Sequence, residues 1–172
     1  MSQGGHASGP PDRVPVVPAE AKCYFCRTLS DPAASEPWCV YEDDLLVATH
    51  QVEDVGPSYL GSILVQTKRH TEGLAGLTDP EAERLGRVVA RVSRALVETV
   101  GASWTYSYGF MEAFRHVHTI IDARYPDLPR EYFRLRIHEW PGAPQGDREA
   151  VGKLVRTLRA RTDGSVAVPR SG

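Results

Sequence analysis

The sequence lacks several features that would assign it to a specialised class of protein. Its three cysteines are too few, and an odd number, for a framework of disulfide bonds. No apolar run approaches the roughly 20 residues that a membrane-spanning helix needs. The N-terminus has no charged start followed by an apolar core, which is the pattern of a secretory signal. These absences favour a soluble protein in a reducing cytoplasm.

A large excess of one charge is also missing. The 20 lysine and arginine residues nearly balance the 22 aspartate and glutamate residues, and the formal net charge is −2. This balance gives no electrostatic case for nucleic acid or a membrane surface as a partner. Hydrophobic residues make up 41% and charged residues 24% of the 172 residues, which is ordinary for one compact domain.

The order of segments predicts a single domain between two tails. Residues 1–20 are rich in glycine, serine and proline and predict a disordered tail with little to bury. Residues 163–172 have the same character. Neither a linker nor an internal repeat interrupts the stretch between them, so we expect one domain over residues 21–162.

Hydrophobic patterns predict five strands and two long helices. The strands are expected at 38–43, 45–50, 59–67, 103–110 and 115–121. A capping box formed by Thr78 and Glu81, with proline in the first turn, predicts the start of one helix, and Gly101 predicts its end. The second helix is expected over 147–161. Because the strands cluster instead of alternating with helices, the pattern indicates an α+β fold with an antiparallel sheet.

Cys23 and Cys26 form a CxxC motif at the start of the expected domain. A redox CxxC usually lies at a strand-to-helix junction inside a βαβ pattern, which is missing here. Two thiolates three positions apart can bind one zinc ion, whereas buried cysteines can also act as small hydrophobic residues. The motif alone leaves both interpretations open. Cys39 lies in an expected strand and is interpreted as a core residue.

Two histidines, His116 and His118, alternate in the last expected strand. Residues two apart on a strand point to the same face, so both imidazoles should lie together. Imidazoles on a buried face are costly to leave without partners, which indicates a functional site. His70, which closes the third expected strand, is a further candidate ligand. Isolated histidines such as His50 and His138 are ordinarily structural.

These motifs resemble the histidine triad (HIT) family of nucleotide-binding hydrolases and transferases. The shared features are a CxxC with aromatic filling, a glycine before an apolar strand that ends in lysine–x–histidine, the entry into a long helix, and alternating histidines ahead of an arginine. They stand here at 23–26, 61–70, 77–79 and 116–124. Residues 124–132 also resemble one bacterial branch. The resemblance covers about residues 23–140 and implies a five-stranded antiparallel sheet with one long central helix and a C-terminal helix.

The resemblance also implies a metal site and a nucleophile. Ligands of the zinc-containing branch correspond to Cys23, Cys26, His70 and His116, a closed set typical of structural zinc. The middle histidine of the motif corresponds to His118. In the family this residue attacks the α-phosphate of a nucleotide and forms a covalent nucleotidyl-histidine. Such chemistry requires a neutral imidazole with one nitrogen free and the other held by an acceptor.

The chain departs from the family pattern close to this nucleophile. Ile120 replaces the third histidine and has no group that hydrogen-bonds to a phosphate. Asp122 and Arg124 follow on the same face of the expected strand; the carboxylate either pairs with a cation near the phosphate or lies in solvent at the strand end. At the end of the second strand, where the family often has an acidic residue for the ribose, His50 is the candidate, and Asp44 and Asp54 are nearby but out of register.

The resemblance implies a homodimeric, zinc-stabilised enzyme that hydrolyses a nucleotide phosphoryl bond or transfers a nucleotidyl group. Two alternatives remain open. One is a degenerate zinc-stabilised scaffold that binds a nucleotide or another ligand without turnover. The other is an enzyme of a specialised pathway with a reshaped pocket. Trp140 would either complete the pocket of the partner subunit or lie in the core.

Overall fold

The computed structural model describes residues 23–31 and 36–162, so the predicted tails at 1–20 and 163–172 lie outside the described residues. Its main sheet contains β1 (Cys39–Glu42), β2 (Leu46–His50), β4 (Ser62–Thr67), β5 (Trp104–Tyr108) and β6 (His118–Arg124). The strand order is β1-β2-β4-β6-β5, and all of its pairings are antiparallel. The α+β fold with a five-stranded antiparallel sheet is therefore confirmed.

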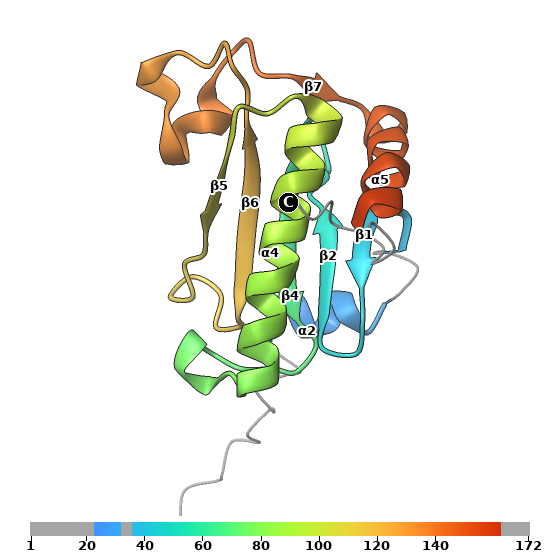
Figure 1. Cartoon of the computed structure of the whole chain (residues 1–172), viewed down its shortest axis with the longest axis vertical. Helices are drawn as coiled ribbons and strands as arrows, with labels where there is room; N and C mark the ends of the chain where they lie inside the picture. Colours follow the sequence, from blue (N-terminus) through green and yellow to red (C-terminus); the bar gives the residue numbers. More distant parts are fainter. Residues whose placement is uncertain (1–22, 32–35, 163–172) are drawn as a thin grey trace, which may run out of the picture.

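Two long helices cover one face of this sheet. Helix α4 (Asp79–Val100) crosses in front of the strands, and α5 (Arg148–Thr162) lies beside β1 (Figure 1). The capping box is formed as expected, since Thr78 Oγ1 accepts from the Glu81 N–H at 3.4 Å while Glu81 Oε2 accepts from the Thr78 N–H at 2.8 Å. Gly101 ends α4 with φ of 68°.

The hydrophobic core lies between these helices and the sheet. The apolar stripe of α4 is buried there, and α5 adds its own apolar side; the fully buried members include Val88, Val92, Leu96, Val151 and Leu158. Alternate residues of the central strands join them, among them Ile63, Val65, Ile121 and Ala123. Because side chains alternate along a strand, the residues between these point to the opposite face, where the candidate site lies.

The expected third strand is divided. Ser58–Tyr59 form β3, which pairs with β7 (Gln145–Gly146) in a separate two-stranded sheet. The break follows from Gly61, which has φ of 89° and passes so close to β6 that a Cβ atom there would lie 2.8 Å from the Ala123 Cβ. An apolar run alone did not reveal this close approach.

The last expected strand is displaced by three residues, because β6 begins at His118 and not at residue 115. His116 lies in the preceding turn, where its N–H donates to the Phe114 carbonyl at 2.7 Å. The prediction that both histidines belong to the strand is therefore wrong for His116. Cys39 is half-buried at the start of β1 and is not a member of the core cluster, which corrects its interpretation as core.

Further short elements complete the described chain. The six-residue helix α2 (Tyr24–Leu29), which the sequence pattern did not predict, carries the CxxC motif, and its buried Phe25 faces the sheet side opposite α4. Short 3-10 helices are η1 (Glu36–Trp38), η2 (Leu74–Gly76), η3 (Arg130–Tyr132) and η4 (Arg134–Glu139). Within the described ranges, none of the helices has the length and apolar character needed to cross a membrane.

Candidate metal centre and active site

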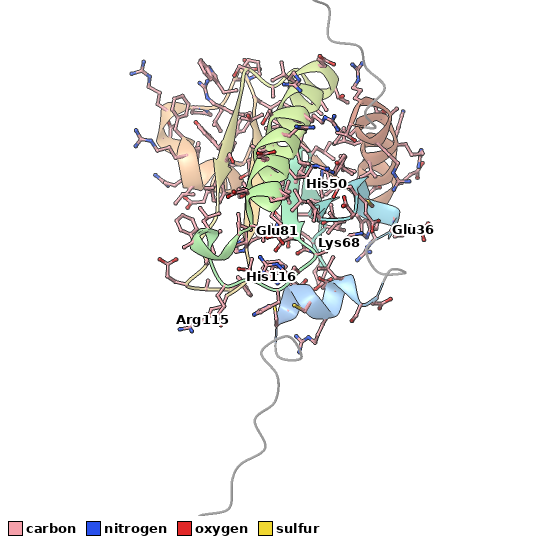
Figure 2. All side chains as sticks on the ribbon, turned by 60° about the horizontal axis from the view of Figure 1, so that its bottom comes forward. Glu36, His50, Lys68, Glu81, Arg115 and His116 are labelled. Atoms are coloured by element: carbon pink, nitrogen blue, oxygen red, sulfur yellow. The ribbon has the colours of Figure 1, made fainter. Side chains whose placement is uncertain are left out.

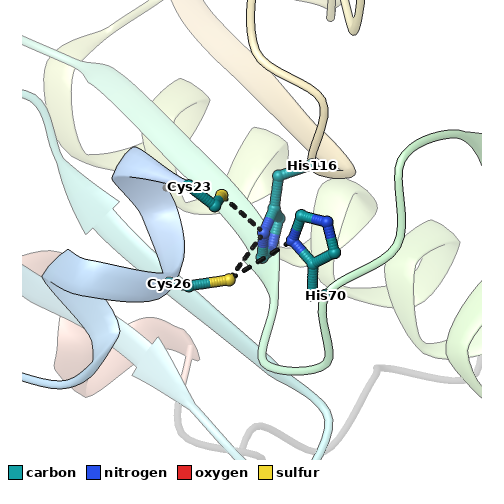
Figure 3. Close-up of side chains that lie close together, drawn as sticks. All are labelled: Cys23, Cys26, His70 and His116. Carbon is teal, nitrogen blue, oxygen red and sulfur yellow. Dashed lines mark hydrogen bonds between the residues drawn. The ribbon is translucent and has the colours of Figure 1, made fainter. Parts of the chain in front are cut away.

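Four side chains from three separate segments meet beside α2. Cys23 Sγ lies 3.4 Å from His116 Nδ1, while Cys26 Sγ lies 3.3 Å from His70 Nδ1 and 3.5 Å from His116 Nδ1 (Figure 3). All four ligand atoms lie within 4.8 Å of one another. Sulfur and nitrogen ligands of a tetrahedral zinc ion are about 3.5 Å apart. The structure thus brings together the four expected ligands in an arrangement that could hold a metal ion.

The His116 ring is oriented for this role by a neighbouring strand. His116 is fully buried next to α2 (Figure 2), and its Nε2–H donates to the Thr67 carbonyl at 2.7 Å. Such a bond to the outer nitrogen directs Nδ1 toward the sulfur atoms. Burial lowers the pKa of His116, which favours the neutral form that a metal ligand requires. His70 Nε2, by contrast, is buried without a hydrogen-bond partner among the described residues.

The His118 imidazole is held by the backbone of the same segment. Its Nδ1–H donates to the His116 carbonyl oxygen at 2.7 Å, so the lone pair remains on Nε2. The side chain is only 4% exposed, and the Phe25 ring lies 4.8 Å away between centroids. The acceptor that the sequence could not reveal is thus the carbonyl of an expected metal ligand. His118 therefore has the free nitrogen that a nucleophilic imidazole requires.

His118 lines a cavity of about 750 Å³, a size typical of small-molecule sites. The wall has a strongly aromatic part, formed by Tyr24, Phe25, Trp38 and Phe114. Asp54 and Arg148 add one acidic and one basic side chain, and the Arg148 guanidinium lies 5.7 Å from the centre of the Trp38 ring. This combination of flat apolar rings with a few polar groups suits a planar ligand that carries charge.

The floor of the cavity is formed by facing residues of β4 and β6. Gln66 is paired with His118, and Leu64 is paired with Ile120 in the antiparallel register. All four residues line the cavity. Ile120, in the place of the expected third histidine, therefore lies beside the nucleophile candidate and forms an apolar pair with Leu64.

His50 lines the cavity, but both of its ring nitrogens have partners. Nδ1–H donates to the Gln51 carbonyl at 2.6 Å, and Nε2 accepts from the Gly61 N–H at 3.0 Å. Burial lowers the pKa of His50 to about 4, so the ring is neutral at physiological pH. The residue expected to bind a ribose instead stabilises the turn that begins β4.

Asp122 and Arg124 are not among the residues that line the cavity with His118. Asp122 is 0% exposed and accepts hydrogen bonds from Tyr108 Oη at 2.6 Å and His138 Nε2 at 3.0 Å, so its interpretation as a solvent-exposed strand end is wrong. The guanidinium of Arg124 lies 4.3 Å from the centre of the Phe133 ring. Both residues therefore contact the segment after β6 in the described structure.

Several residues of the cavity wall were not predicted from the sequence. Gln66 is a polar residue within an apolar strand, and this pattern is a signal visible in the sequence. Trp38 and Arg148 line the cavity because α5 packs against η1, which sequence patterns do not reveal. Asp54 lines the cavity although it is out of register with the family position. Trp140 packs against a second cluster around Ile137, so within the described chain it contributes to the core.

Comparisons with known proteins agree with this architecture. No family model matches the chain. An uncharacterized HIT-like protein of Borreliella burgdorferi is 36% identical over 74 residues, which cover 43% of this chain and only 50% of that relative's length. A solved zinc-bound histidine triad family protein from Mycobacterium smegmatis matches with a TM-score of 0.62 at 23% identity. The match covers 86% of this chain and 100% of that protein. The chain has the histidine triad fold.

A second solved structure supports the histidine triad fold. A hypothetical histidine triad nucleotide-binding protein from Sulfolobus tokodaii has a TM-score of 0.61 at 22% identity, over 82% of this chain and 92% of that one. The resemblance inferred from the sequence is thus confirmed at the level of the fold, and one of the structural neighbours is a zinc-bound protein. Within the histidine triad fold, the cluster around Cys23 and the cavity at His118 lie side by side, joined through His116.

Proposed function

We propose that this protein is a nucleotide hydrolase or nucleotidyl transferase that acts through a covalent intermediate on His118. The observation that carries the proposal is the hydrogen bond from His118 Nδ1–H to the His116 carbonyl at 2.7 Å. It leaves Nε2 unprotonated on a side chain that lines the cavity. The name of the Sulfolobus tokodaii neighbour, a hypothetical nucleotide-binding protein, is consistent with a nucleotide as the ligand.

The proposed reaction has two displacements at one phosphorus atom. His118 Nε2 donates its lone pair to the α-phosphorus, and the bond to the leaving group breaks, so that this group departs with the bonding electrons and takes up a proton from solvent. Water or another acceptor then attacks the same phosphorus, loses a proton, and displaces the imidazole. The Nδ1–H bond to the His116 carbonyl stabilises the positive charge that the ring carries in the intermediate.

The cavity wall suits the other parts of a nucleotide. We assign the base to the aromatic residues around Phe25 and Trp38, because flat rings bind a base by stacking. Asp54 is the only acidic side chain among the described lining residues, and we assign the ribose hydroxyls to it in place of His50. Ile120 and Leu64 add an apolar surface next to the reacting group.

We also propose that Cys23, Cys26, His70 and His116 bind one structural zinc ion. The cluster geometry and the zinc-bound neighbour from Mycobacterium smegmatis support this assignment. When bound, the ion would neutralise the thiolates and tie the start of the described chain to the turns after β4 and before β6. The described residues supply four ligands, so this site would be closed and the chemistry would remain with His118.

A homodimer completes the proposal. Strand β5 lies at the edge of the main sheet with one side unpaired in the described chain, and its Trp104 is 67% exposed. An exposed edge strand with a large apolar side chain is suited to pairing with a second copy. Light scattering coupled to size exclusion measures the mass directly, and Trp104→Glu should shift a dimer toward the monomer.

The mechanism is tested by the mass of the intact protein after brief mixing with nucleoside phosphoramidates, dinucleoside polyphosphates and sugar nucleotides. We expect an added nucleotidyl mass in the parent protein and in His138→Gln, which changes a histidine outside the cavity lining. His118→Ala should show none and should lose turnover while it remains folded. Binding without any adduct or product in the parent would instead establish a ligand-binding scaffold.

A further inference from the structure

The side chain of Gln66 is a buried polar group that the proposed chemistry does not use. It is 4% exposed and lines the cavity, yet its Oε1 atom has no hydrogen-bond partner among the described residues. Burying an unpaired carbonyl of this kind costs on the order of 1–3 kcal/mol. Such a cost is compensated where a bound molecule supplies the missing donor.

Gln66 is also placed at the reacting centre. It is the direct partner of His118 in the pairing of β4 with β6, and the Cβ atoms of directly paired residues are about 4.5–5.5 Å apart. Apart from His118, the neighbouring side chains in the sheet are apolar: Leu64 and Ile120 form the adjacent pair, and Val47 is paired with Gln66 on the other side. Of the two amide side chains that line the cavity, Gln51 already accepts from Ser62 Oγ at 2.7 Å, so the Gln66 oxygen is the one left to select for a feature of a ligand.

We infer that Gln66 is a specificity-determining residue whose carboxamide oxygen accepts a hydrogen bond from an N–H or O–H group attached to the phosphoryl group at His118. This inference rests on the proposed function, because it takes the phosphoryl group to lie at His118. Gln66 on β4 would thus make the polar contact with the ligand that Ile120 on β6 cannot make. Ligands with a donor on the phosphorus are therefore favoured over ligands with a methyl group in the same place.

Two probes that differ only at this position test the inference. Adenosine 5′-phosphoramidate has an NH₂ group on phosphorus, whereas the methyl ester of adenosine 5′-phosphate has OCH₃ there, and the guanosine pair covers the other purine. Dissociation constants are measured calorimetrically in a His118→Ala background, so that neither probe is consumed. Gln66→Met removes the amide at similar length, and Gln145→Met changes an exposed glutamine outside the cavity lining.

We expect Gln66→Met to weaken binding of the phosphoramidate by about 5- to 30-fold and to leave the methyl ester within about threefold. Gln145→Met should leave both constants unchanged. Thermal unfolding should show Gln66→Met to be at least as stable as its background, because the variant removes an unpaired buried carbonyl.

The outcomes distinguish failure of the inference about Gln66 from failure of the proposed nucleotide function. If both probes bind and Gln66→Met retains the discrimination, the inference about Gln66 is overturned and the proposed function stands. The inference is also overturned if Gln145→Met has the same effect, since the loss would then not be local. If none of the four probes binds to the protein with His118 intact or replaced, the inference and the nucleotide function both fail.

Discussion

Ile120 is the residue that most separates this chain from the histidine triad pattern. It lines the cavity two positions after His118 and is paired with Leu64. A histidine at this position could donate a hydrogen bond to the phosphate, whereas isoleucine has no donor. The chemistry of the cavity therefore depends on whether such a donor is missing or is replaced by another group.

We expect Ile120→His to raise the rate of cleavage of a nucleoside phosphoramidate by about 10- to 100-fold. A hydrogen bond to a charged group contributes about 1.5–3 kcal/mol, and its full value appears in the rate if it forms only in the transition state. Steady-state kinetics measure the effect, and Ile120→Leu serves as the matched apolar change that should give no increase. A lower rate in Ile120→His would contradict the prediction and show that an apolar substrate group lies against this residue.

The hydrogen bond between Asp122 and His138 should make a pH-dependent contribution to the stability of the fold. The hydrogen bond to Asp122 raises the pKa of His138 above 6.5. A raised pKa in the folded state contributes stability that is fully present below the unfolded pKa and is lost as the pH rises through the folded value. We therefore expect the parent protein to be stabilised over His138→Gln at pH 5.5, with the difference shrinking by pH 9. Urea unfolding at the two pH values measures it, and an unchanged difference would contradict the pairing.

At the scale of elements, the start of α4 is connected to the turn that holds His70. Arg69, the neighbour of His70, donates to both carboxylate oxygens of Glu81 at 2.8 and 2.6 Å, and Glu81 closes the capping box (labelled in Figure 2). The hydrogen bonds from Arg69 lower the pKa of Glu81 to about 2. One carboxylate thus stabilises the helix terminus and positions the turn between β4 and α4.

The lowered pKa of Glu81 predicts an acid-dependent contribution to stability. A depressed pKa contributes stability above the unfolded value of 4.5, and this contribution is lost as the pH falls toward the folded value of about 2. We expect Glu81→Gln to be less stable than the parent at pH 6 and the two to converge between pH 4.5 and 2. Chemical unfolding across this range tests the convergence; parallel curves at all pH values would contradict it. Exposed Glu83 provides the control Glu83→Gln.

Elements governed by local sequence could be predicted. The capping box and Gly101 set the ends of α4 without reference to the remainder of the chain. The division at Gly61 and the displaced start of β6 could not be read locally, because both depend on contacts with other strands. Similarly, the resemblance indicated the ligand set and His118, but the cavity position of Gln66 follows from strand register.

At the scale of the whole molecule, one residue connects the cluster of candidate metal ligands to the cavity. The Nδ1 atom of His116 faces the cysteines, while its carbonyl accepts from His118. The cluster joins α2 to the turns at the ends of β4 and β6, and Phe25 of α2 packs against the His118 ring. Loss of the cluster should therefore disturb both the stability of the fold and the position of the His118 ring.

We expect about one zinc ion per chain and a strong dependence of stability on it. Because a closed site contributes its binding free energy to folding, Cys23→Ser and His70→Ala should each lower the free energy of unfolding by about 4 kcal/mol or more. Cys39→Ser, a cysteine outside the cluster, is the matched control and should cost far less. Metal analysis of freshly purified, untagged protein and thermal unfolding with and without chelator measure both quantities. Protein that contains no zinc and is equally stable in chelator would rule the site out, and His118 would then be held by the fold alone.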